Sequence, residues 1–209
     1  MKDVVSLIDD IYQAGVDPSH WMTALTRICD ALHGVDAVIG GITAGNAPLF
    51  LAPRTDPHWI GLYAQHYHAR NPMQLAMMRH APGVAAADSQ LVDIDSFHAG
   101  DFYNEWCVPQ GHMSGMAINF ATSGGGGATM MISSRAQVEG ASLHLLEQLA
   151  PHLARAFRMN QMLEENRAMT LNAFTALEHA DRGVFFVSNM GTCTPANVLA
   201  QAIVARGDG

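Results

Sequence analysis

Residues 101–120 read DFYNEWCVPQGHMSGMAINF, and this stretch sets the expected fold. Its first part continues a predicted helix over 94–106, whose aromatic residues gather toward one side. Pro109-Gln110-Gly111 predicts a turn. Two strands are then expected, at 114–122 and 128–133. The glycine run 124–127 between them suits a hairpin loop; a phosphate cradle is the distant alternative, because no Lys-Ser/Thr pair follows.

The preceding residues predict helices and three strands. Residues 4–12 and a segment beginning at Asp17-Pro18 show helical spacing, and Asp followed by Pro is a helix-start signal. Further expected elements are strands at 35–43 and 48–52, a helix from Asp56-Pro57 that Asn71-Pro72 breaks, a short helix from Pro72 to Met77, and a strand at 84–87.

Residues 142–177 have a helical composition over an unusual length. Pro151 is expected to kink this helix, and the alternative is two shorter helices joined near Arg158. A helix of this length usually connects domains or pairs with its copy in a dimer. The stripe that would form such an interface consists of Leu146, Leu149, Leu153 and Ala156.

The end of the chain changes in character. We expect strands at 183–187 and 192–194 and a helix over 196–204. One strand pair and one helix cannot bury a core alone. The order of elements therefore predicts an α/β (α+β) fold, an antiparallel sheet covered by helices on at least one face. The expected divisions are a first domain at 1–141, a long connecting helix at 142–177 and the incomplete start of another domain at 178–209.

The composition excludes several classes of protein. The 209 residues are 49% hydrophobic and 14% charged, which excludes a disordered chain. No run approaches the ~20 apolar residues of a membrane span, and no secretory signal is present, so we expect a cytoplasmic protein that does not cross a membrane. A net charge of −8 with one lysine predicts poor nucleic-acid binding by this chain. Three widely spaced cysteines predict neither a disulfide framework nor a zinc module, and we expect no metal or cofactor.

Residues 56–72, DPHWIGLYAQHYHARNP, carry a stripe of aromatic side chains. Trp59, Tyr63 and Tyr67 are four residues apart and share one helix face. Their polar atoms are costly to bury without partners, so a pocket with polar ligand atoms would satisfy them. The other interpretation, which the residue types alone favour, is an amphipathic helix packed on the sheet with its hydroxyls in water.

The order of these motifs resembles the autoinducer-binding domain of LuxR-type quorum-sensing regulators. The residues that carry the resemblance are Trp59, Tyr63, Asn71-Pro72, Phe102-Tyr103, Ser114-Gly115 and the hairpin to Ser133. Residues 149–157 are similar to the stretch after the sensor domain in larger LuxR-type regulators. The last segment, in which Asn197 opens a helix, is similar to the start of a PAS domain. The resemblance covers about residues 10 to 209.

The resemblance implies a GAF/PAS-like sandwich that binds a small, partly apolar molecule. The implied ligand-binding residues are Trp59, Tyr63, Tyr67, Asn71, Phe102, Tyr103, Trp106 and Met131. Trp59 and Trp106 would form apolar walls, whereas Tyr63 and Asn71 would hold the polar head in a cavity of a few hundred Å³. The family has an Asp where this chain has Asn71, and an uncharged acceptor there puts an acyl-homoserine lactone in doubt.

The function that follows is the sensory region of a LuxR-type helix-turn-helix transcriptional regulator, in signal transduction. We expect a homodimer that reaches DNA only through a C-terminal domain absent from this chain. The alternative is a ligand-free dimerisation module on the same fold. An enzyme is not expected: Cys107 and His112 could be a nucleophile and a base, but nothing marks an oxyanion stabiliser. The ligand, the operator and the direction of regulation are not identified by the sequence.

Overall fold

A computed structural model describes residues 2–42, 48–121 and 127–207 of the chain. These residues form two compact units, Met1–Gln161 and Met162–Gly209, and each is described by itself. The expected division at 141 and 177 into separate domains stays a prediction. Among the described residues, no helix combines the length and apolar character needed to cross a bilayer.

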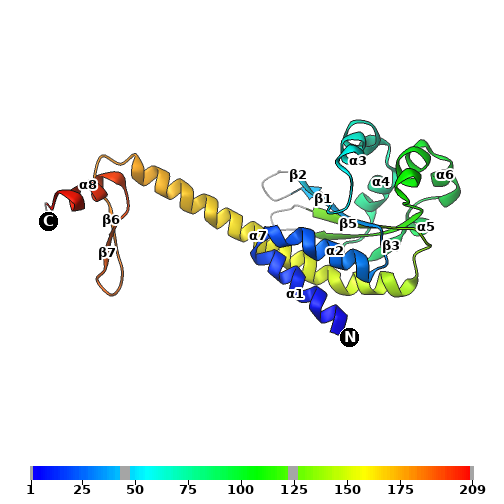
Figure 1. The fold of residues 1–209 in the computed structure, drawn as a ribbon, viewed down its shortest axis with the longest axis horizontal. Coiled ribbons are helices and arrows are strands. Elements are labelled where there is room, and N and C mark those ends of the chain that lie inside the picture. The colour runs from blue at the N-terminus through cyan, green and yellow to red at the C-terminus, as the bar shows by residue number, and fades with distance from the viewer. Residues whose placement is uncertain (1, 43–47, 122–126, 208–209) are drawn as a thin grey trace. The chain divides into compact units, whose positions relative to one another are not determined.

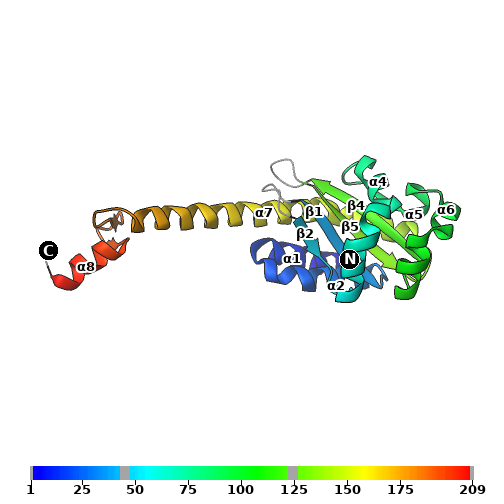
Figure 2. The ribbon, with the colours of Figure 1, turned by 90° about the horizontal axis from the view of Figure 1, so that it is seen from above.

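The first unit is built on a five-stranded antiparallel sheet with the strand order β2-β1-β5-β4-β3. The strands are β1 (Asp36–Ile42), β2 (Pro48–Leu51), β3 (Ala85–Ala87), β4 (Ser114–Ala121) and β5 (Gly127–Ser134). β4 and β5 pair along their whole length, from Ser114↔Ser134 to Ala121↔Gly127. The predicted antiparallel pair is therefore confirmed, whereas residues 122–126 of the glycine-rich connection lie outside the described residues. Figure 2 shows these strands side by side.

Three helices cover one face of the sheet: α1 (Lys2–Val16), α2 (Trp21–Ala31) and the part of α7 (Gly140–Glu178) that belongs to this unit (Figure 1). Successive side chains of a strand point to opposite faces, so alternate residues of the central strands enter this core. The fully buried side chains include Leu25, Ile28, Ile39, Ile118, Met130, Ile132, Leu146, Leu149 and Leu153.

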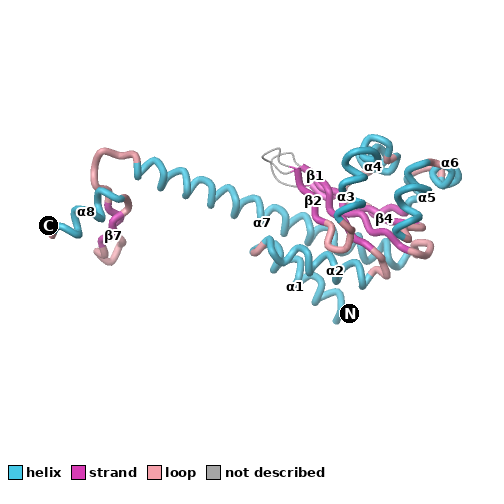
Figure 3. The backbone as a smooth tube through the Cα atoms, turned by 45° about the horizontal axis from the view of Figure 1, so that its top comes forward, coloured by secondary structure: helices cyan, strands magenta, loops and turns pink. Residues whose placement is uncertain are grey.

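Short helical segments cover the opposite face, as Figure 3 shows with the strands as a layer between two sets of helices. They are α3 (Pro57–Leu62), α4 (Pro72–Arg79), α5 (Asp88–Leu91) and α6 (Ile94–Ala99), with π-helical turns at Tyr63–Tyr67 and Phe102–Cys107 and 3-10 turns at His68–Arg70 and Val108–Gln110. Asp56 and Asn71 cap α3 and α4 through their side chains, as the Asp-Pro and Asn-Pro signals predict. The predicted continuous helix over 94–106 is wrong, because Gly100 takes an extended backbone that ends α6.

α7 is continuous through Pro151 and Arg158, so the alternative of two shorter helices is wrong. The apolar stripe proposed as a dimer interface is also reassigned. Leu146, Leu149, Leu153 and Ala156 are fully buried in the core of their own chain. The physical reason is the sheet: its apolar face needs a cover, and this stripe supplies it.

Asn160 fastens α7 to the first two helices. Its amide nitrogen donates to the backbone carbonyls of Ala14 (3.0 Å) and Gly15 (2.6 Å), and its carbonyl accepts from the indole N–H of Trp21. The last carbonyls of a helix have no partner within that helix, so Asn160 satisfies two groups at the end of α1. Nearby, a Cβ added at Gly15 would lie 3.0 Å from Cα of Ala156, so a larger residue there would push these two helices slightly apart.

The second unit comprises residues 162–178 of α7, the strands β6 (Phe185–Val187) and β7 (Cys193–Pro195), and α8 (Val198–Arg206). Asn197 is buried and connects these elements. Its carbonyl accepts from the backbone N–H groups of Ala200 (2.9 Å) and Val184 (3.1 Å), and its amide nitrogen donates to the carbonyls of Leu177 and Arg182. The predicted order of strand, turn, strand and helix opened by Asn197 is confirmed.

Replacing Asn160 with Ala should lower the free energy of unfolding by about 2–3 kcal/mol, because it leaves two carbonyls and an indole N–H without their partner. Urea denaturation followed by circular dichroism measures this. Asn172→Ala, at an exposed position of the same helix, is the control and should change stability by under about 0.5 kcal/mol. Equal effects of the two substitutions would contradict the role given to Asn160.

Candidate functional site

An aromatic cluster lies on the sheet face away from α1 and α2. Its buried members are Tyr67, Met73, Phe97, Phe102, Tyr103 and Cys107, and Tyr63 and Trp106 pack against them. The rings of Phe102 and Trp106 are stacked, with centroids 5.2 Å apart. The centroids of the Tyr63 and Trp106 rings are 5.3 Å apart. These aromatic side chains form a second apolar centre, distinct from the core under α1, α2 and α7.

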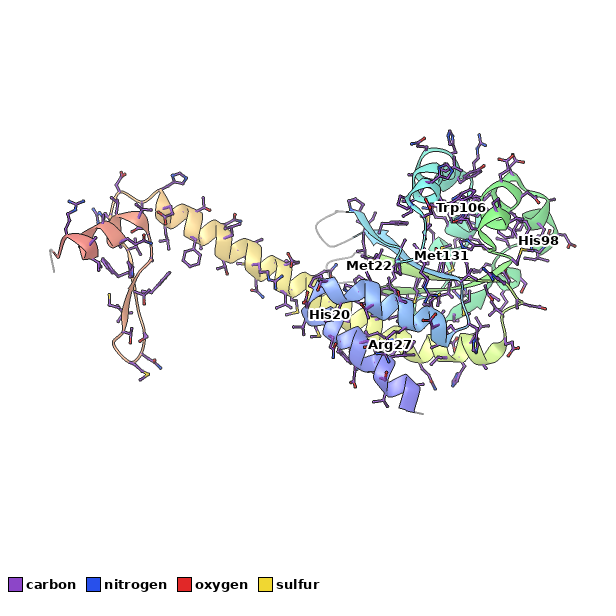
Figure 4. All side chains as sticks on the ribbon, in the orientation of Figure 1. His20, Met22, Arg27, His98, Trp106 and Met131 are labelled. Atoms are coloured by element: carbon purple, nitrogen blue, oxygen red, sulfur yellow. The ribbon has the colours of Figure 1, made fainter. Side chains whose placement is uncertain are left out.

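A cavity of about 60 Å³ separates part of this cluster from the sheet. Phe102, Trp106 and Met131, three of the predicted ligand-binding residues, line it; Figure 4 labels Trp106 and Met131. The other lining residues are Met73, Asp88, Leu91, Phe97, Cys107, His112, Met113, Ser114, Gly115, Met116, Ala117, Ile132 and Ser133.

The cavity corrects two expectations. It is smaller than the predicted few hundred Å³, because the stacked rings of Phe102 and Trp106 occupy much of the space over the sheet. Trp59 and Tyr63 were expected to line it, and neither does. Instead, the backbone carbonyl of Trp59 accepts from the indole N–H of Trp106 (3.1 Å), and the Tyr63 ring supports the lining rings.

The polar atoms of the other predicted residues already have protein partners. Asn71 is only 3% exposed; its carbonyl caps α4 by accepting from the N–H of Met73 (2.9 Å), and its amide donates to the Tyr63 hydroxyl (3.1 Å). The Tyr67 hydroxyl donates to Glu105 (2.6 Å), and the Tyr103 hydroxyl donates to the Met113 carbonyl (3.4 Å). That any of these residues contacts a ligand stays a prediction.

The sequence did not identify two polar residues of the cavity lining as candidate binding residues. Asp88 is 7% exposed, and its carboxylate accepts from the N–H groups of Ser89 (2.8 Å) and Gly115 (2.9 Å). His112 is 8% exposed, and its ring packs edge-on against Trp106. Its buried Nδ1 has no hydrogen-bond partner among the described residues, and burial lowers the pKa of the imidazole. His112 therefore faces the cavity neutral at physiological pH.

The chemistry of Cys107 opposes the nucleophile–base pair considered from the sequence. Burial, assisted by the charge of Asp88, raises the pKa of its thiol to about 12. The thiolate is the nucleophilic form, so at neutral pH this cysteine is held in its unreactive state. The described residues also contain no group of three His, Cys, Asp or Glu side chains placed to hold a metal ion.

The surroundings of the three cysteines predict that one thiol per native chain reacts rapidly with a thiol reagent. Cys193 is exposed, whereas Cys29 and Cys107 are buried with pKa values raised to about 11 and about 12. At pH 8, a chromogenic disulfide reagent should modify Cys193 roughly 100-fold faster than the other two. Cys193→Ser should abolish the fast phase, and guanidinium should release all three thiols; a fast phase that survives the substitution would refute this assignment.

No model of a known protein family matches the sequence, and no curated protein sequence matches it. Solved structures do match the fold. The LBD domain of VqsR from Pseudomonas aeruginosa is 15% identical, with a TM-score of 0.58 over 74% of this chain and 94% of that one. The N-acylhomoserine lactone-dependent LuxR-family transcription factor CepR2 from Burkholderia cenocepacia is 11% identical, with a TM-score of 0.55 over 78% of this chain and 99% of that one.

The layers of the first unit agree with this likeness. The expected antiparallel sheet with covering helices is confirmed, with helices on both faces. The chain therefore has the fold of the ligand-binding domains of LuxR-type regulators.

Proposed function

We propose that this chain is the sensory region of a LuxR-type transcriptional regulator and binds a small, partly apolar molecule in the cavity between the sheet and the aromatic cluster. The observation that supports this most is an apolar cavity with a few polar lining groups, in a fold shared with ligand-binding domains. In this proposal, Phe102, Trp106 and Met131 contact the ligand directly. Trp59, Tyr63, Tyr67, Asn71 and Tyr103 shape the wall and reach the ligand once the cavity expands.

Expansion is supported by the composition of the wall. Met73, Met113, Met116 and Met131 all line the cavity. Methionine has three rotatable side-chain bonds and adapts its shape at low cost, so a ligand larger than 60 Å³ can enter by displacing these side chains. The exposed position of Met113 gives one of them room to move.

Met116 and Ile132 connect the cavity to the core. Both line the cavity, and both belong to the core that contains Leu146, Leu149 and Leu153 of α7. A ligand that displaces β4 or β5 side chains therefore acts on the residues that support α7. We propose that this contact carries the signal to a separate DNA-binding module, since this chain of net charge −8 is poorly suited to bind DNA itself.

The small cavity supports a second candidate, a ligand-free dimerisation module on the same fold. In this candidate the stacked Phe102 and Trp106 rings are permanent core, and the domain acts only by pairing two cytoplasmic copies. The two candidates differ in whether the cavity ever accepts a molecule.

Protein purified from its native host should retain a small molecule, detected by native mass spectrometry and identified after organic extraction. Ala117→Phe should abolish retention, because Ala117 lines the cavity and a benzyl group fills about its whole volume. Ala99→Phe, an exposed position on α6, is the matched control and should retain the molecule. Identical spectra from extracts of the parent protein and Ala117→Phe would favour the ligand-free module.

We also propose a homodimer through the exposed part of α7. Met162 and Met169 are exposed and seven residues apart, so they share one helix face. Met162→Glu combined with Met169→Glu should weaken the dimer at least about tenfold in analytical ultracentrifugation, because it places charges in an apolar contact.

The control for this measurement makes the same change of two in net charge elsewhere on the helix. Leu171→Glu combined with Arg167→Gln changes exposed residues that lie roughly opposite Met162 and Met169, and should leave the dimer intact. A parent protein that is monomeric at tens of micromolar, or two double variants that dissociate equally, would overturn the dimer proposal.

A further inference from the structure

The cavity lining contains a buried negative charge without a counter-charge beside it. Asp88 lines the cavity and is only 7% exposed. Its carboxylate accepts hydrogen bonds from the backbone N–H groups of Ser89 (2.8 Å) and Gly115 (2.9 Å), and such bonds favour the charged form. In the part of the chain that the structure describes, Asp88 forms no ion pair, and the cavity lining contains no Lys or Arg.

The other titratable groups around this end of the cavity do not cancel the charge of Asp88. His112 in the lining is neutral, because burial lowers the pKa of its imidazole by more than the charge of Asp36 raises it. Asp36 itself is a second buried carboxylate, whose charge Arg54 partly offsets. Arg135 lies beside Gly111, but its side chain is exposed, so water screens its charge.

The charge of Asp88 acts on other parts of the lining. Burial raises the pKa of the Cys107 thiol to about 12, and Asp88 contributes in the same direction. The interaction between two charges falls only inversely with their distance, and it is several times stronger in a poorly solvated site than in water. A charged ligand in a cavity of about 60 Å³ therefore interacts with Asp88 even without contact between them.

We propose that Asp88 is a specificity-determining residue of the cavity, which excludes molecules that carry a carboxylate and admits uncharged molecules of the same shape. The inference rests on the proposed ligand-binding function and adds the class of ligand. Every ion loses its hydration on entering an apolar cavity. An anion is in addition repelled by Asp88, whereas a cation is attracted. The expected order of affinity is therefore uncharged molecule first, cation second and anion last.

Three small molecules with four-carbon chains test this order. The full chain, labelled with ¹³C at its methionine methyl groups, is titrated at pH 7 with butyramide, n-butylammonium and butyrate. Butyramide and butyrate have nearly the same shape and differ in charge. The Met131 methyl resonance, assigned with Met131→Leu, reports occupancy of the cavity. We expect butyramide to bind at least about tenfold more tightly than butyrate, with n-butylammonium between them.

Asp88→Asn distinguishes an effect of charge from an effect on structure. Loss of the charge should strengthen the binding of butyrate and weaken that of n-butylammonium, each at least about threefold, while butyramide changes by less than about twofold. A distorted cavity would instead move all three affinities in the same direction. Asp95→Asn removes the same charge from an exposed position on α6, and this control should leave all three affinities unchanged.

A second pair of variants leaves the hydrogen bonds of Asp88 intact and decides the test if Asp88→Asn does not fold. Met113 lines the cavity and is 44% exposed, so a lysine there can hold its ammonium group near the cavity and in water. Met113→Lys should narrow the preference for butyramide over butyrate at least about threefold. Met113→Gln, which introduces a polar group without a charge, should keep the preference.

The outcomes separate this inference from the function on which it rests. Equal affinities of the parent protein for butyramide and butyrate would overturn the role of Asp88 and leave a cavity without charge selection. The role would also be overturned if Asp88→Asn and Met113→Lys exclude butyrate as strongly as the parent, since loss of hydration would then explain the exclusion. Tighter binding of n-butylammonium than of butyramide would replace the uncharged class with a cation. No shift of Met131 with any probe would overturn ligand binding in this cavity and this inference with it.

Discussion

The alternation of side chains along β4 and β5 is the constraint on which the rest of the first unit depends. In a strand, neighbouring residues face opposite sides of the sheet. Met130 consequently enters the core under α1, α2 and α7, whereas its neighbour Met131 meets the cavity. A shift of one residue in the pairing Ala117↔Met131 would exchange the two faces and destroy both the core and the cavity at once.

The two faces are built for different purposes. The core face is closed by long helices and fastened by Asn160, which bonds to backbone groups more than 140 residues away in the chain. The other face is covered by short helical segments, two π-helical turns and a cluster of aromatic and methionine side chains. Methionine side chains adapt their shape, so the proposed binding site could yield on this side while the packing of the other face stays unchanged.

The sequence predicts those features that depend on nearby residues. The helix starts at Asp56, Asn71 and Asn197 and the β4–β5 pair follow from caps, prolines and alternation over a few positions. Features that depend on long-range packing could not be predicted. The stripe from Leu146 to Ala156 is visibly apolar, but its pattern does not reveal that its own sheet covers it. Likewise, Asn160 looks like an interruption of that stripe until its partners in α1 are known.

The candidate site divides in the same way. Aromatic spacing identified Phe102 and Trp106, which line the cavity, but it also selected Trp59 and Tyr63, which do not. Asp88 and His112 carry no local signal, since only the folding of β3, β4 and the Phe102–Cys107 turn brings them into one lining.

The central claim is that one of two adjacent methionines faces the closed core and the other faces the cavity. Xenon, which enters small apolar cavities, tests this claim most directly. In ¹³C-methyl methionine spectra recorded under xenon pressure, the account predicts that the Met131 resonance shifts and the Met130 resonance does not. Equal shifts of both, or a shift of Met130 alone, would contradict it.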